Sequence, residues 1–316
     1  MEIIMVYSEI TAYMPKSLQP TLKRLFSTFP GIIEEIRFKT NRPLCISAGA
    51  AILFVDAEGG ITDNIAEAYT VTDTDMTIIF KNICENSVYA YLDEIRKGFI
   101  TIRGGHRVGF TGRAITSPSG AIENFGDISS INIRVAREIK GSADPMMKHI
   151  LRDGKIFNTL VVSPPQMGKT TVLRDITRQL STLKYKTAVA DDRGEISAMY
   201  RGVPQNDLGP LTDVMFNAPK HLAVVMMLRS MSPDVIITDE IATEEDVGAL
   251  MLAFGSGVSI IASAHGSNKD EILQKPIFKP LFANCVFENI IMLSRKTFSR
   301  DGRVVDSFLQ FENISL

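Results

Sequence analysis

The chain has 316 residues, of which 45% are hydrophobic and 22% charged, and its formal net charge at pH 7 is −2. Single hydrophobic cores seldom grow beyond about 250–300 residues, so we expect two domains with a sizeable core. The small net charge gives no global attraction to nucleic acid, and a nucleic-acid partner is therefore not expected, although a local basic face stays open.

The cysteines and the N-terminus bear on the compartment. Cys45, Cys84 and Cys285 are widely spaced and odd in number, which suits a reducing compartment and argues against a disulfide framework or a zinc ribbon. The N-terminus lacks a basic segment before its short apolar run, and nowhere do about eighteen apolar residues occur consecutively. We expect a cytoplasmic protein without a transmembrane segment, at most peripheral to a membrane.

The first part of the chain has the pattern of a small α+β domain. Apolar spacing predicts helical structure over 8–29, 76–84 and 88–96, β structure over 32–38 and 44–55, and glycine-rich paired strands over 99–115. A polar stretch at 141–145 precedes a further helix that ends near Gly154. We therefore place the domain boundary at about residue 140, with an N-terminal domain over 1–140 and a second domain over 141–316.

The second domain repeats strand, helix, strand. Its apolar strands are expected at 160–162, 187–190, 235–238 and 258–263. Continuous apolar strands alternating with helices predict an α/β domain with a mainly parallel sheet, buried on both faces. A terminal hairpin around Asp301–Gly302 closes this domain.

The segment 159–171, TLVVSPPQMGKTT, is the most informative in the chain, because an apolar strand runs into a turn that ends Gly-Lys-Thr and opens a helix. In such a P-loop (Walker A) the backbone N–H groups face the β-phosphate, Lys169 reaches the β/γ oxygens, and the Thr170 hydroxyl ligates Mg²⁺. The residues predicted to hold the nucleotide are Ser163, Pro164, Pro165, Gln166, Met167, Gly168, Lys169, Thr170 and Thr171.

The loop departs from the usual pattern at its first position. Ser163 replaces the glycine that begins the consensus, and Pro164 and Pro165 remove two amide donors. Phosphate contacts are therefore expected from later amides. An ordinary strand-to-helix turn is the alternative interpretation of this segment on its own.

A β-branched run, 234–240, ends in two carboxylates some seventy residues after the loop, as in a Walker B strand. Asp239 is expected to hold the Mg²⁺ shell through water, and Glu240 to polarise or deprotonate the attacking water.

Another apolar strand is followed at 191–195 by charged residues, namely Asp191, Asp192, Arg193 and Glu195. Ligands gather outside the carboxyl ends of such strands, so these side chains can approach the phosphate site, and Glu195 stays a second candidate for the base. A solvated charged turn is the alternative.

A fourth buried strand ends at His265, where a γ-phosphate sensor would lie, after a helix expected over 243–254. A lone histidine is more often structural. Its place in the series favours a catalytic role, and the series as a whole predicts a P-loop ATPase that uses ATP and Mg²⁺.

The order of these motifs resembles that of the traffic ATPases of type II and type IV secretion systems, in which an acidic box, a Walker B strand and a histidine box follow the P-loop. The segment 227–234, MLRSMSPD, matches a signature of that family before the Walker B strand. This resemblance implies a RecA-like domain, a ring that is a hexamer, and a role for Glu240 as the family's glutamate.

Three further segments narrow the resemblance. SPPQMGKTT at 163–171, DRGEI at 192–196 and GFITIRGGHRVG at 98–109 resemble the stage III sporulation protein AA family over nearly the whole chain. Ser163 is ordinary within that family. The resemblance implies a mother-cell ATPase, similar to secretion motors, that energises a channel between mother cell and forespore through membrane channel components.

The N-terminal half carries arginines in a glycine-rich β context, and related ATPases place such arginines near nucleotide, sometimes across a subunit interface. An arginine acting in trans would stabilise charge on the γ-phosphate. Arg134 is our candidate, although arginine on an exposed strand is ordinary. The other members of the set are Arg103, Arg107, Arg113 and Arg137.

We therefore predict an ATP-hydrolysing motor of the secretion type, in which the N-terminal domain closes over the nucleotide. The predicted catalytic residues are Glu240, Lys169, Glu195, His265 and Arg134, and the predicted metal ligands are Thr170 and, through water, Asp239. The alternatives are a nucleic-acid-stimulated ATPase, because RecA-like cores serve many functions, and a non-catalytic nucleotide-dependent scaffold.

Overall fold

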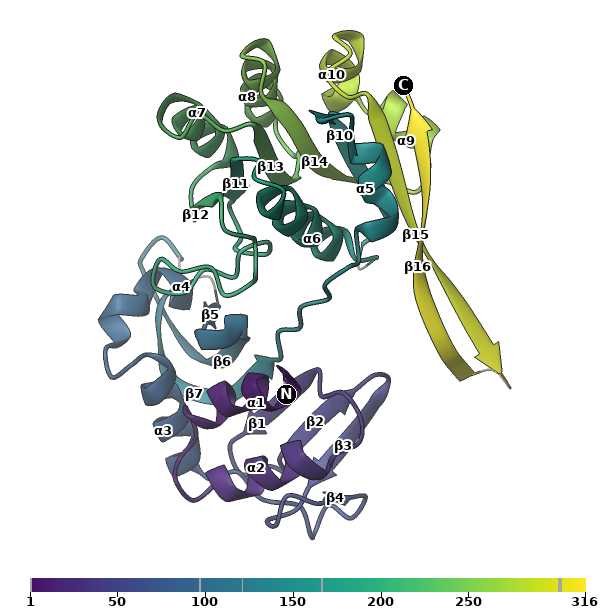
Figure 1. The fold of residues 1–316 in the computed structure, drawn as a ribbon. Helices are drawn as coiled ribbons and strands as arrows, with labels where there is room; N and C mark the ends of the chain where they lie inside the picture. The colour runs from purple at the N-terminus through teal and green to yellow at the C-terminus, as the bar shows by residue number, and fades with distance from the viewer. Residues whose placement is uncertain (1, 97, 121, 166, 301–302) are drawn as a thin grey trace. The chain divides into compact units, whose positions relative to one another are not determined.

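A computed structural model describes residues 2–96, 98–120, 122–165, 167–300 and 303–316. The chain splits into two compact units (Figure 1). The N-terminal unit comprises Met1–Arg137 and Tyr200–Gln205, and the C-terminal unit comprises Glu138–Met199 and Asn206–Leu316. The sequence patterns give no sign that Tyr200–Gln205, which interrupts the C-terminal unit along the chain, belongs to the N-terminal unit.

The N-terminal unit is built on an antiparallel sheet of order β4-β3-β2-β1-β7-β6-β5. Its strands are β1 (Glu35–Lys39), β2 (Cys45–Ala48), β3 (Ala51–Val55), β4 (Ile61–Thr62), β5 (Phe99–Thr101), β6 (Arg107–Thr116) and β7 (Ile122–Arg134). Alternate residues of β1 are buried, with Ile36 and Phe38 at 0% exposure. This period of two gives the sheet one apolar face.

Helices pack on that apolar face. They are α1 (Glu2–Thr11), α2 (Gln19–Thr28), α3 (Asp73–Ile83) and α4 (Leu92–Arg96), with short 3₁₀ turns η1 (Val88–Tyr91) and η2 (Arg103–Gly105). The helical spacing over 8–29 does not show the break that the structure has between α1 and α2. Pro15 lies between them and Pro20 occupies the first turn of α2. A proline suits the first turn of a helix but not its interior, which explains the break.

The segment Tyr200–Gln205 is fastened to the N-terminal unit at both ends. Glu85 accepts a hydrogen bond from the Tyr200 hydroxyl and pairs with Arg201. At the other end, the Gly104 amide donates to Gln205 Oε1 at 2.9 Å. The chain therefore leaves the C-terminal unit at Met199 and returns to it at Asn206.

The C-terminal unit contains a mainly parallel sheet of order β12-β11-β13-β14-β10-β15-β16, in which β16 alone among the described strands runs antiparallel to its neighbour. The strands are β10 (Thr159–Ser163), β11 (Thr187–Asp191), β12 (Thr212–Phe216), β13 (Val235–Glu240), β14 (Ser259–His265), β15 (Asn289–Arg300) and β16 (Arg303–Ser315), beside a small hairpin of β8 (Leu151–Arg152) and β9 (Lys155–Ile156). The sequence patterns miss β12, an edge strand that is half exposed and so lacks an apolar run.

Helices cover both faces of this sheet (Figure 1). They are α5 (Asp144–Ile150), α6 (Lys169–Thr182), α7 (Lys220–Ser230), α8 (Glu244–Gly255), α9 (Lys269–Gln274), η3 (Pro276–Phe278) and α10 (Lys279–Ala283). Val161 packs in the core that α5 and α6 form, whereas Leu160 and Val162 pack in the core that α7 to α10 form. Among the helices described, none is long and apolar enough to cross a membrane.

The terminal hairpin extends past the sheet. β10 pairs with β15 over Asn289–Met292, whereas β15 and β16 pair with each other from Asn289 to Arg300 (Figure 1). The turn predicted at Asp301–Gly302 lies outside the described residues.

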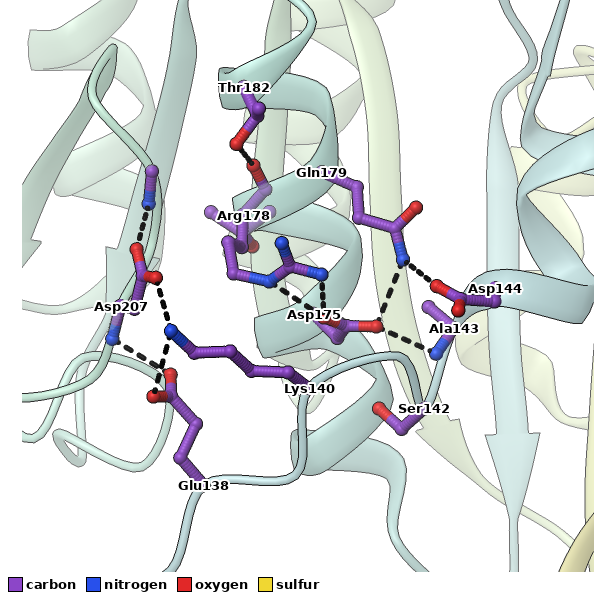
Figure 2. A network of polar contacts seen from close by, with 12 residues as sticks. Glu138, Lys140, Ser142, Ala143, Asp144, Asp175, Arg178, Gln179, Thr182 and Asp207 are labelled. Carbon is purple, nitrogen blue, oxygen red and sulfur yellow. Dashed lines mark hydrogen bonds and ion pairs between the residues drawn. The ribbon is translucent and has the colours of Figure 1, made fainter. Parts of the chain in front are cut away.

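A buried carboxylate fastens the start of the C-terminal unit to α6 (Figure 2). Asp175, 3% exposed, accepts hydrogen bonds from the Ala143 amide at 2.9 Å and from Gln179 Nε2 at 3.0 Å. Arg178 donates twice to its other oxygen, at 2.9 and 2.6 Å. Burial opposes ionisation of Asp175, but the bonds from Ala143 and Arg178 hold its pKa below the usual value.

We predict that Asp175→Ala lowers the free energy of unfolding by about 2–4 kcal/mol, because it leaves a buried amide and a guanidinium without their acceptor. Urea unfolding at pH 7 measures the change. Asp144→Ala, which removes an exposed acceptor of Gln179, should lower the free energy of unfolding by less than about 1 kcal/mol.

The contribution of Asp175 also depends on pH. Because its folded-state pKa lies below the ordinary 3.8, the stabilisation is fully present above pH 3.8 and is lost as the pH falls through the folded-state pKa. A loss for Asp175→Ala no larger than for Asp144→Ala would contradict this account.

Candidate active site

The candidate site lies at the carboxyl edge of the parallel sheet. β10, β11, β13 and β14 run parallel, and Ser163 at the end of β10 pairs with His265 at the end of β14. Parallel strands bring their carboxyl ends to the same edge, where ligands bind in open α/β folds. A cavity of about 490 Å³ opens there, lined by Pro165, Gly168, Lys169, Thr170, Thr171, Arg193, Glu195, Lys220, Asp239, Glu240, Ser263 and His265.

The loop after β10 delivers the start of α6 to this cavity. Gly168 caps the helix with φ of 89°, a left-handed conformation that favours glycine. Among the described residues, no side chain caps the N-terminus of α6, so the first-turn amides and the positive end of the helix dipole face the cavity. That arrangement suits an anion such as phosphate.

The predicted loop residues do not all reach the cavity wall. Pro165, Gly168, Lys169, Thr170 and Thr171 line it. Ser163 is buried, and its hydroxyl donates to the Pro164 carbonyl at 2.7 Å. Ser163 therefore serves the turn rather than the lining. Pro164 and Met167 lie in the same turn, and Gln166 lies outside the described residues.

The Lys169 ammonium lies at the end of β10. It donates to the Ser163 carbonyl at 3.1 Å and contacts His265 Nδ1 at 2.9 Å, and the residue is 9% exposed. Burial lowers the pKa of Lys169, while the charges of Glu240 and Glu195 act in the opposite direction. A cation that is partly desolvated in this way interacts strongly with an incoming anion.

His265 connects Lys169 to Glu240. Its Nε2 lies 3.1 Å from Glu240 Oε2. Because an ammonium can only donate, Nδ1 must accept, and Nε2 must then carry the ring proton and donate to the carboxylate. The contacts thus assign the tautomer of His265 and fix the orientation of Glu240.

β13 presents both of its terminal carboxylates to the cavity. Its register against β14 shifts between Ile237 and Glu240, so that three residues of β13 oppose two of β14. Successive side chains of a regular strand point to opposite faces, and a bulge of this kind re-aims them. Asp239 and Glu240 therefore line the same cavity.

Asp239 is buried and paired. Lys220 Nζ lies 2.5 Å from Asp239 Oδ1 and donates to the Glu240 carbonyl. Burial raises the pKa of Asp239 to about 6, although the charge of Lys220 lowers it.

Lys220 is a cavity residue that the sequence motifs do not predict. It opens helix α7 directly after Pro219, ahead of the apolar run from Leu222 to Leu228. A cation at a helix N-terminus is disfavoured by the helix dipole, so its position there is the one signal in the sequence that a carboxylate partner lies nearby.

Asp191 has a structural role. It is fully buried and accepts from the amides of Glu195 at 2.9 Å, Ile196 at 3.3 Å and Ser197 at 2.8 Å, and from the Ser197 hydroxyl at 2.5 Å. Arg174 of α6 donates to the carbonyls of Glu195 and Ile196. The turn that carries Glu195 and Arg193 into the cavity wall is therefore anchored to β11 and α6, and Asp191 itself is absent from the residues that line the described cavity.

The candidate arginines lie in the N-terminal unit and have local contacts. Arg134 pairs with Glu35 at 3.2 Å, Arg113 with Asp127 at 2.7 Å and Arg103 with Glu9 at 3.7 Å. Arg107 stacks on the Phe99 ring at 3.9 Å. The structure thus brings Lys169, Glu195, Glu240 and His265 together and places Arg134 in the other unit.

The residues present fit a nucleotide phosphate with its divalent cation. The uncapped α6 amides and Lys169 provide donors for phosphate. The Thr170 hydroxyl provides an oxygen ligand of the kind that Mg²⁺ prefers, and the Asp239 carboxylate provides an acceptor for waters around such an ion.

Comparison with solved structures identifies the fold. The ATPase DotB of Legionella pneumophila superposes with a TM-score of 0.58 at 16% identity, over 93% of this chain and 79% of that one. The pilus retraction motor PilT with bound ADP gives a TM-score of 0.60 at 15% identity, over 90% and 79%. The predicted fold, a RecA-like P-loop domain with a smaller α+β domain, is confirmed, and the protein shares this fold with DotB and PilT.

The sequence comparisons identify the family. A family model described as "Sporulation stage III, protein AA" matches residues 8–308. Stage III sporulation protein AA of Bacillus subtilis (strain 168) is 36% identical over 311 residues, which cover 94% of this chain and 97% of that protein. The chain belongs to the stage III sporulation protein AA family, which confirms the resemblance seen in the sequence.

We predict that Asp191→Ala speeds hydrogen exchange of the Glu195 and Ser197 amides at least about tenfold, since their shared acceptor is lost. NMR-detected or mass-spectrometric exchange measures this. Asp192→Ala is the matched control, because it removes a neighbouring carboxylate that these amides do not contact. Equal protection in both variants would contradict the anchoring role.

Carboxyl NMR in the presence of EDTA should show Asp239 titrating at about 6 rather than at the ordinary 3.8. Lys220→Gln should move the midpoint upward, because the Lys220 charge favours the ionised carboxylate. Asp175 serves as the internal reference, with a midpoint below the ordinary value. A wild-type midpoint for Asp239 near 3.8 would contradict the claim that burial raises the pKa of this carboxylate.

Proposed function

We propose that the protein is a Mg²⁺-dependent ATPase whose site is the cavity at the carboxyl edge of the parallel sheet. The observation that carries the proposal is the contact series from Lys169 through His265 to Glu240, at 2.9 and 3.1 Å. It links the predicted phosphate-binding cation to the predicted base within a cavity of about 490 Å³. The fold of the secretion ATPases supports the same function.

The binding roles follow from position. The first-turn amides of α6 and the Lys169 ammonium would hold the β- and γ-phosphates. Thr170 would ligate Mg²⁺ directly, and Asp239 would do so through water. When bound, Mg²⁺ neutralises charge that develops on the phosphate oxygens.

Glu240 is the proposed base. His265 donates to its Oε2 and fixes the carboxylate beside Asp239. Glu240 can then orient a water and take its proton as the water oxygen bonds to the γ-phosphorus, while the bond from that phosphorus to the β–γ bridging oxygen breaks and ADP leaves. Glu195 lines the same cavity, but its turn is fixed through main-chain contacts rather than through His265. We assign Glu195 to shaping the site and His265 to sensing the γ-phosphate through the contact that it makes with Lys169.

We infer further that hydrolysis drives a motor of the secretion type, assembled as a hexameric ring. The family supports a role in sporulation, and the resemblance noted in the sequence suggests that the motor energises a channel between mother cell and forespore. In that ring, Arg134 of the N-terminal unit is the candidate to act in trans.

Steady-state hydrolysis tests the assignment. Glu240→Gln should lower kcat about 10²–10⁴-fold while retaining nucleotide binding, because it removes the base and keeps the shape. Lys169→Ala should weaken binding of a fluorescent ADP analogue as well as turnover. Glu244→Gln, which changes an exposed carboxylate at the start of α8, is the matched control and should behave like the wild type.

The outcomes separate the two glutamates. Loss of turnover in Glu195→Gln together with full activity in Glu240→Gln would transfer the role of base to Glu195. Nucleotide binding without hydrolysis in the wild type, alone and in assembled form, would favour the scaffold.

A further inference from the structure

The ion pair between Lys220 and Asp239 involves the carboxylate that the proposed function assigns to the Mg²⁺ shell. Lys220 Nζ and Asp239 Oδ1 lie 2.5 Å apart. Both residues are buried, with 9% of Lys220 and 7% of Asp239 exposed. Lys220 also donates to the carbonyl of Glu240, the adjacent residue. The ammonium is thus held at the end of β13 by two acceptors from neighbouring residues.

Asp239 lies among other negative charges, which Lys220 partly balances. Asp191 and Glu195 both act on Asp239 with the same sign of charge, and Glu195 lines the cavity together with Glu240. Lys220 therefore supplies positive charge to a cavity that several carboxylates line. A divalent cation held by the same carboxylate through water would lie close to this ammonium, and like charges repel each other in a partly buried site.

Lys220 also lines the cavity, as do the cations Lys169 and Arg193. A polyphosphate bound at the α6 N-terminus would bring several negative charges into that space. The ammonium would then gain an alternative anionic partner within the cavity, and the cost of separating it from Asp239 would fall.

We propose that Lys220 is an internal counter-ion of Asp239. Its ammonium excludes a free divalent cation from this carboxylate, and it separates from the carboxylate when a polyphosphate enters the cavity. The inference rests on the proposed function of the site. Binding of the metal and of the nucleotide is then coupled, and by linkage each favours the other. A lysine that acts only by holding β13 in place would not affect metal affinity in this selective way.

Mn²⁺ binding followed by electron paramagnetic resonance tests the proposal without relying on hydrolysis. In the absence of nucleotide, and at a pH above the Asp239 midpoint of both proteins, the wild type should bind Mn²⁺ weakly. Lys220→Gln should bind it about tenfold more tightly, because the charge is removed while an amide donor stays for the Glu240 carbonyl. Lys220→Arg keeps the charge and should resemble the wild type.

The matched control is Lys275→Gln. Lys275 likewise donates to a strand-end carbonyl, that of His265 at 2.5 Å, and pairs with Glu271 at 3.1 Å. It does not line the cavity described above. Its replacement should leave Mn²⁺ affinity unchanged.

ADP completes the design. Adding ADP should raise Mn²⁺ affinity strongly in the wild type and several-fold less in Lys220→Gln, since part of the coupling is lost. Unchanged Mn²⁺ affinity in a folded Lys220→Gln would overturn the proposal. Should that variant not fold, nucleotide-free wild type that binds Mn²⁺ as tightly as the ADP complex would overturn it equally. Failure of the wild type to bind ADP at all would instead refute the proposed function.

Discussion

The parallel pairing of β10 with β14 is the constraint on which the site depends. It sets Ser163 beside His265, and because Lys169 follows β10 by one turn, its ammonium meets the His265 ring. A slip of one residue would point each side chain to the opposite face of the sheet and would separate the two. The catalytic proposal is therefore a consequence of register, which the two apolar cores on either face of the sheet hold in place.

Buried charge is the second theme of the C-terminal unit. Asp175, Asp191 and Asp239 are each nearly inaccessible, and each is matched differently. Asp175 has amide and guanidinium donors, Asp191 has main-chain amides and a hydroxyl, and Asp239 has the Lys220 ammonium. The two carboxylates that accept from main-chain amides, Asp175 and Asp191, fix local structure. Asp239 pairs with an ammonium that itself lines the cavity, and it is the carboxylate whose partner we propose is exchanged, which agrees with its assignment to the metal shell.

Much of this fold follows from sequence patterns, because apolar strands and glycine-bearing turns are local signals. The strands β10, β11, β13 and β14 and the start of α6 are examples, as is the α+β character of the N-terminal unit. The split of the first helical region followed from Pro15 and was missed by spacing alone. Three features depend on contacts distant in sequence: the pairing of Lys220 with Asp239, the bulge that turns both carboxylates of β13 into the cavity, and the place of Tyr200–Gln205 in the N-terminal unit. Motifs report the type of chemistry, whereas the identity of each partner depends on packing.

The most direct test of the central claim is an experimental structure of the protein with Mg²⁺ and a non-hydrolysable ATP analogue. The account predicts the β-phosphate on the amides of Gly168 to Thr171, the γ-phosphate within hydrogen-bond reach of Lys169, and a metal ion bound to the Thr170 hydroxyl. Nucleotide bound away from the carboxyl edge of the parallel sheet, with this cavity left empty at saturating analogue, would contradict it.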